Sequence, residues 1–153
     1  MNGFLYSLAL QWKLDIRSKS LLVTYYIVPL IFFLLMGGIF TSVMPEMGST
    51  LIQSMIVMSV SMGAFLGLPP SLIETYGSDI KKIYKANGVP IHLGLVTMVL
   101  SAFLHLMITC MVILLLAPIL FKANLPSQFP LFFLALAIYI FVSLSIGSIL
   151  GLT

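Results

Sequence analysis

Long apolar runs alternate with short polar stretches along this chain. The apolar runs cover residues 21–43, 51–70, 93–121 and 130–152. Each is long enough to supply the roughly 20 residues that a helix needs to cross the hydrocarbon core of a bilayer, about 30 Å thick. The pattern therefore predicts four membrane-spanning helices.

The composition agrees with this pattern. Hydrophobic residues make up 61% of the 153 residues and charged residues only 7%, whereas an average soluble domain is about 25% charged. A soluble domain of this length still exposes roughly 30% of its chain surface, and this sequence has too few polar residues to cover it. We expect an all-α integral membrane protein with a single transmembrane domain.

Residues 4–18 precede the first span and have an imperfect amphipathic pattern. At about 100° per residue, one arc of the helix is apolar, with Asp15 at its edge. The arc is formed by Phe4, Leu5, Leu8, Ala9, Trp12 and Ile16. Trp12 and the basic side chains of Lys13 and Arg17 suit the headgroup level of a membrane. The pattern favours an interfacial elbow helix, with an ordinary membrane-proximal tail as the alternative.

Prolines and glycines indicate how the spans bend and pack. Pro29 should kink the first span, since it lacks a backbone donor, and a neighbouring helix must then satisfy the freed carbonyl. Pro69-Pro70 should disrupt the second span where it reaches the membrane surface. Gly63 and Gly67 form a small-xxx-small pair that lets helices approach closely. We favour packing within the chain for this pair, with a dimer interface as the alternative. Gly147 and Gly151 form a second such pair.

The polar stretch 74–90 contains five of the eleven charged residues. Ser78 can cap a short helix over 79–85, and Asn87-Gly88 followed by Pro90 is a stop signal. The apolar side of this predicted helix is formed by Ile80, Ile83 and Tyr84. The rest of its surface is basic, with Lys81, Lys82 and Lys85. About two turns of helix are marginal in water, so we expect it to lie against a surface.

The distribution of charge predicts the topology. Six of the seven basic residues fall on one side of a four-span arrangement, and only Lys122 falls on the other. The positive-inside rule then places the N-terminus and the stretch 74–90 in the cytoplasm. The last span has no polar flank, so we expect the sequence to be interrupted rather than finished.

Motifs for chemistry are absent from the sequence. It contains no GxxxxGK[ST], HExxH or CxxC run and no paired carboxylates, so we expect no catalytic, cofactor or metal site, and no nucleic-acid partner. Cys110 is expected to be a packed thiol. His105 is the one ionisable residue that the pattern places deep in a span. We interpret it as a structural residue bonded to a neighbouring Ser or Thr, or as part of a translocation path.

The order of these features resembles a known family. An amphipathic basic stretch (LALQWKLDIRSKS) leads into a span with an early proline (LLVTYYIVPLIFFLLMGGIF). The second span ends in LIETYGSDIKKIYKANGVPIHLGL and a long third span follows. The chain is similar to the ABC transporter type-2 permeases, which typically carry an acidic residue, a glycine, a basic-hydrophobic segment and a proline here. These correspond to Glu74, Gly77, residues 80–85 and Pro90.

The resemblance implies a membrane subunit of a bacterial exporter in the plasma membrane, with six spans in the complete subunit. It also implies pairing with a second permease, identical or different, and with two cytoplasmic ATPases that bind the ATP. A coupling helix after the second span would contact the ATPase, and the residues implied are Glu74, Gly77, Ile80, Lys81, Ile83, Tyr84 and Lys85. Spans five and six have no counterpart in this sequence.

Other interpretations remain open at this point. The stretch 74–90 could instead rest on anionic lipid headgroups as a basic patch. The whole chain could be a small non-transporting scaffold, such as an accessory or immunity protein that packs against other spans. A membrane enzyme acting on lipid is disfavoured, because the sequence shows no catalytic constellation.

Overall fold

The structure is a computed structural model that describes residues 3–77, 82, 86, 88 and 90–152. Within these residues the chain forms helices and no strand. The elements in chain order are α1 (Gly3–Arg17), α2 (Lys19–Leu22), π-helical η1 (Val23–Ile27), α3 (Val28–Val43), 3-10 η2 (Pro45–Ser49), α4 (Leu51–Met62), π-helical η3 (Gly63–Gly67), α5 (Leu68–Gly77), α7 (Ile91–Phe121) and α8 (Phe129–Leu152).

Four long apolar helices confirm the all-α membrane fold that the sequence predicts. The candidate spans are Lys19–Val43, Leu51–Gly77, His92–Phe121 and Phe129–Leu152. The first two are continuous helices that contain η1 and η3, while α7 and α8 are uninterrupted. The 31 residues of α7 extend about 46 Å at 1.5 Å per residue, so α7 is longer than the bilayer core is thick. The chain is a multi-span membrane protein.

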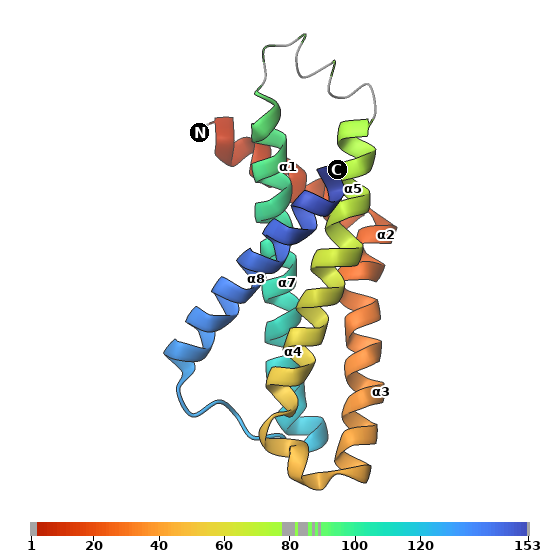
Figure 1. Cartoon of the computed structure of the whole chain (residues 1–153), viewed down its shortest axis with the longest axis vertical. Helices are drawn as coiled ribbons and strands as arrows, with labels where there is room; N and C mark the ends of the chain where they lie inside the picture. The colour runs from red at the N-terminus through yellow and green to blue at the C-terminus, as the bar shows by residue number, and fades with distance from the viewer. Residues whose placement is uncertain (1–2, 78–81, 83–85, 87, 89, 153) are drawn as a thin grey trace.

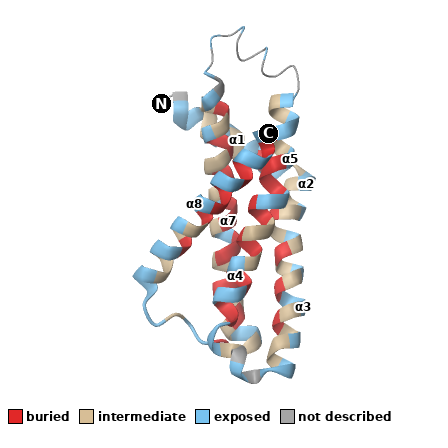
Figure 2. Ribbon diagram, in the orientation of Figure 1, coloured by how far each residue is buried: buried red, intermediate tan, exposed pale blue. Residues whose placement is uncertain are grey.

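The spans form a bundle, with α1 lying across one end (Figure 1). α5 packs against α8, α4 packs against α3 and α7, and α1 packs against α7. Buried residues gather where α4, α5, α7 and α8 meet, and much of α3 and of the first half of α8 is exposed (Figure 2). Since these exposed surfaces are apolar, they suit contact with lipid.

The kink expected at Pro29 takes the form of the π-helical segment η1. Pro29 cannot donate to the carbonyl of Tyr25, four residues earlier. The Thr109 hydroxyl of α7 donates to that carbonyl oxygen at 2.7 Å. A neighbouring helix therefore satisfies the freed backbone group, as membrane helices with internal proline require.

The expectation that Pro69-Pro70 disrupts the second span is wrong. The helix continues through both prolines to Gly77. The residues four before the prolines, Phe65 and Leu66, lie in η3, where the wider π-turn relieves the clash between each proline ring and the carbonyl behind it. The π-turn lets the prolines sit inside a continuous helix.

Both small-xxx-small pairs pack within the chain. A Cβ on Gly67 would lie 2.9 Å from the Tyr25 ring, and one on Gly63 would meet the Leu106 side chain of α7. A Cβ on Gly147 would overlap the carbonyl oxygen of Ala64. These glycines let η3 approach η1 and α7 on one side and α8 on the other.

The two ends of the bundle have different connections. At one end α4 follows η2, and the backbone amide of Asn124 donates to the carbonyl oxygen of Gly48, which joins the two connections there. At the other end lies the connection between α5 and α7. Lys82 and Ala86 have helical backbone there, and the remaining residues of the predicted helix 79–85 lie outside the described residues.

Candidate functional site

α1 contacts α7 through the Asp15 carboxylate and the Trp12 ring. Asp15 is buried, with 7% of its surface exposed, whereas Phe4, Leu5 and Ile16 of the expected apolar arc are exposed. The amphipathic pattern predicts Asp15 at the edge of that arc. The side of α1 that faces α7 therefore carries Asp15 together with Trp12 of the apolar arc, while Lys13 and Arg17 are exposed.

Each oxygen of the Asp15 carboxylate accepts a hydrogen bond from a neutral donor. The Ser101 hydroxyl of α7 donates to Oδ2 at 2.5 Å, and the Gln11 side-chain amide, one turn earlier on α1, donates to Oδ1 at 2.8 Å. Ser101 is completely buried. Hydrogen bonds to a charged acceptor are stronger than neutral ones, so this carboxylate fixes α1 to α7.

His105 lies beside the same carboxylate, one helical turn after Ser101. Its ring stacks on Trp12 at 4.2 Å between centroids and 7° between planes, and on Tyr25 at 5.6 Å. Its Nδ1 lies 2.6 Å from the Tyr26 hydroxyl. Its Nε2 lies 3.9 Å from Asp15 Oδ2 and has no hydrogen-bond partner among the described residues.

We call this group the polar cluster. It brings two elements near the start of the chain together with α7, which is far from both in the sequence. Its members are Gln11, Trp12 and Asp15 of α1, Tyr25 and Tyr26 of η1, and Ser101, His105 and Thr109 of α7. Thr109 completes it by bonding the Tyr25 carbonyl. The cluster joins the first helix and the first span to α7.

A cavity of about 270 Å³ lies between α1 and the start of α7. Its lining includes Ser7, Gln11 and Thr97 together with apolar residues. Gln11 both lines this cavity and donates to Asp15. One side chain thus separates the cavity from the buried carboxylate.

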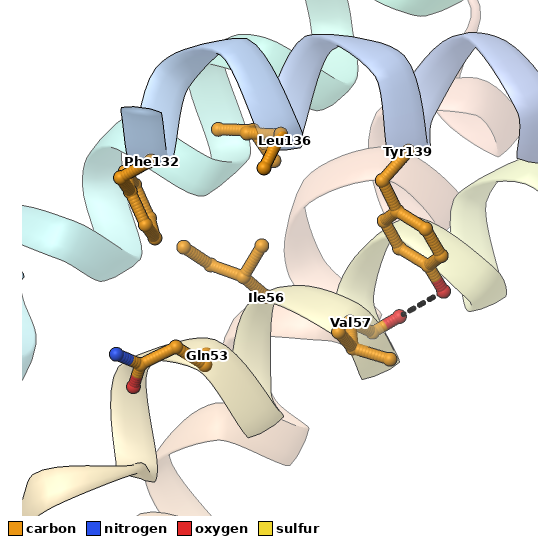
Figure 3. A pocket seen from close by; sticks show the side chains of 7 residues that line it. Gln53, Ile56, Val57, Phe132, Leu136 and Tyr139 are labelled. Atoms are coloured by element: carbon orange, nitrogen blue, oxygen red, sulfur yellow. Dashed lines mark hydrogen bonds between the residues drawn. The ribbon is translucent and has the colours of Figure 1, made fainter. Parts of the chain in front are cut away.

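A second cavity, of about 170 Å³, lies between α4 and α8 (Figure 3). Ile56 and Val57 of α4 face Phe132 and Leu136 of α8 across it. The Tyr139 hydroxyl at its edge lies 2.8 Å from the Ser61 hydroxyl and donates to the Val57 carbonyl at 3.3 Å. This cavity is almost entirely apolar, so it suits a lipid chain or another apolar group.

The residues that the sequence analysis assigned to coupling fall at one end of the bundle. Glu74 and Gly77 are exposed in the last turns of α5. Ile80, Lys81, Ile83, Tyr84 and Lys85 lie outside the described residues. His105 lies in the polar cluster, where its Nδ1 meets Tyr26 and not a Ser or Thr.

Sequence reasoning missed Asp15 as a site residue. The available signal was a carboxylate at the edge of an apolar arc, one turn after Gln11 and three residues after Trp12. Periodicity alone could not show that this side of the helix faces Ser101 and His105, because that depends on how α1 lies across α7.

Comparison with protein-family models, with curated proteins and with solved structures gives no match. The fold and composition define an all-helical, multi-span membrane protein.

Proposed function

We propose that the chain is a membrane-spanning permease subunit of an ABC-type exporter, driven by ATP that a separate cytoplasmic subunit hydrolyses. The observation that carries the proposal is the placement of the connection between α5 and α7. α5 ends at Gly77 and α7 begins at Ile91 at the same end of the bundle, and both helices extend past the level at which α2 begins (Figure 1). A soluble partner could reach this end without entering the membrane.

The packing of the bundle would transmit a movement of this connection to the spans. α5 packs against α8, and α7 carries α1 through the polar cluster. A push on the connection would move α5 together with α8 relative to α7 together with α1. α4, which continues into α5, would slide against α7 in such a movement, as rigid elements slide past one another.

Charge supports a cytoplasmic position for this end. Lys13, Arg17 and Lys19 lie on or next to α1, at the end that carries the connection, and Lys82 lies in the connection itself. Glu46 and Lys122 belong to the connections at the opposite end. This asymmetry follows the positive-inside rule. The proposal includes the plasma membrane of a bacterium as the location of the chain and a second permease subunit as its partner.

The test is co-purification from the native membrane in mild detergent. We expect an ATP-binding subunit with ATPase activity to co-purify with the wild-type chain. Replacing Ile83→Asp together with Tyr84→Asp should abolish this association, because the apolar side of the short helix could no longer enter a groove of the partner. Leu125→Asp, at an exposed position in the opposite connection, is the matched control and should leave the association intact.

Two results would contradict the proposal. One is the purification of the intact chain without any ATPase, which would favour a non-transporting membrane scaffold. The other is full retention of the ATPase by the double Asp variant, which would remove the connection from the contact.

A further inference from the structure

The Nε2 atom of His105 is the least satisfied polar group in the polar cluster. It is buried, it has no hydrogen-bond partner among the described residues, and the 3.9 Å to Asp15 Oδ2 exceeds hydrogen-bond length. Leaving a buried polar atom unpaired is costly. The surroundings of this nitrogen therefore call for an explanation beyond packing.

The neutral and the protonated imidazole make different hydrogen bonds in the polar cluster. In the neutral tautomer that carries its hydrogen on Nε2, the Tyr26 hydroxyl donates to Nδ1 and the Nε2–H group has no acceptor within hydrogen-bond distance among the described residues. When a hydronium ion transfers a proton to Nδ1 and leaves as water, both ring nitrogens become donors. Nδ1–H then donates to the Tyr26 oxygen, and the positive ring attracts the carboxylate, so that Nε2–H and Oδ2 can close to a charge-assisted hydrogen bond. No other bond forms or breaks.

Burial of the ring disfavours its charged form, and three neighbouring groups oppose that cost. Asp15 supplies a negative charge within 4 Å, and the faces of Trp12 and Tyr25 stack on the imidazole. Aromatic faces attract cations, Trp most strongly. Tyr25 and Tyr26 of η1 are the titratable groups in ring contact with His105, and Asp15 is the charged group that α1 presents to it.

We propose that His105 and Asp15 form a proton-binding site that links α1 to α7. The route we propose for the proton is the cavity between α1 and the start of α7, because Gln11 both lines this cavity and donates to Asp15. The ligand is a proton, so this inference does not rest on the proposed transport function. It holds for the isolated chain.

Trp12 provides a direct reporter of this site, because it is the one tryptophan of the chain and stacks on His105. Imidazolium quenches a neighbouring indole more strongly than neutral imidazole does. We expect the fluorescence of the protein in lipid nanodiscs to fall reversibly, in a single transition, between about pH 8 and pH 5. His105→Gln should lose the transition.

The control is His92→Gln, since His92 is the other histidine and is exposed at the start of α7. This variant should keep the transition. Asp15→Asn should lower the proton affinity of the site by about tenfold, because a carboxylate this close favours the charged imidazole.

Nitrogen NMR of the two imidazoles in the wild-type protein tests the same site without any variant. The His105 resonances should change over the pH range of the fluorescence transition. Wild-type fluorescence and His105 resonances that stay constant from about pH 8 to pH 5 would overturn the proposal, even if His105→Gln failed to fold. So would a transition that persists in a folded His105→Gln variant.

Discussion

Asp15 and Ser101 stand 86 residues apart in the sequence and share a hydrogen bond of 2.5 Å in the fold. Gln11 binds the second carboxylate oxygen, and Trp12 stacks on His105 nearby. Two successive turns of α1 are thereby attached to α7. At the scale of single residues, the polar cluster decides which side of an ambiguous amphipathic helix faces the protein.

Asp15→Ala is expected to destabilise the protein by about 2–3 kcal/mol, because the Ser101 hydroxyl and the Gln11 amide lose a charged acceptor. Thermal unfolding in mild detergent measures the effect. Glu46→Ala, at an exposed acid in η2, is the control and should change little. Equal stability of the two variants would mean that the carboxylate does not hold α1.

Thr109→Val tests the bond to the carbonyl freed by Pro29. The substitution conserves shape and removes the donor, so the Tyr25 carbonyl is left buried without its partner from α7. We expect a loss of about 1–3 kcal/mol in denaturant unfolding. Thr41→Val removes only bonds to two carbonyls of its own helix and should cost clearly less; a reversed order would contradict this account of the kink.

At the scale of helices, the sequence predicts which residues cross the membrane but not how the prolines are accommodated. The apolar runs 93–121 and 130–152 match α7 and α8 closely, since length and hydropathy fix a span. Pro69-Pro70 is a stop signal in a sequence, yet η3 before it lets the helix continue to Gly77. That outcome depends on tertiary contacts of Gly63 and Gly67, which no local pattern contains.

Gly147→Ala is expected to destabilise the contact between α8 and η3 by about 1–3 kcal/mol, because the new methyl group would overlap the Ala64 carbonyl oxygen. Gly38→Ala is the matched control, since nothing lies within 4 Å of its Cβ position. It should be neutral or stabilising by up to about 1 kcal/mol. Denaturant unfolding in lipid bicelles compares the two, and similar losses in both would argue against close packing at Gly147.

At the scale of the whole molecule, the two ends of the bundle differ in charge and in the helices they join. The sequence predicts this asymmetry from the positions of its basic residues. It could not predict the polar cluster, which requires α1 to lie across α7 and η1 to approach it. The pattern of apolar and basic residues therefore predicts how the chain is arranged along the membrane normal. It predicts much less about how the helices pack against one another in the membrane plane.

Thiol labelling tests the proposed orientation. In a Cys110→Ser background, which removes the one native cysteine, Lys82→Cys should react with a membrane-impermeant reagent only after the cells are opened. Lys122→Cys, in the opposite connection, should react in intact cells. Labelling of position 82 from outside would place the connection between α5 and α7 beyond reach of a cytoplasmic ATPase.

Photo-cross-linking from the α5–α7 connection tests the central claim most directly. A photoreactive amino acid at position 82, which is exposed, should cross-link in native membranes to a subunit that carries an ATP-binding motif. The same probe at the exposed position 122 should not. Cross-links from position 82 that reach only lipid, with no ATP-binding subunit among the products, would contradict the proposal that this chain is driven through that connection.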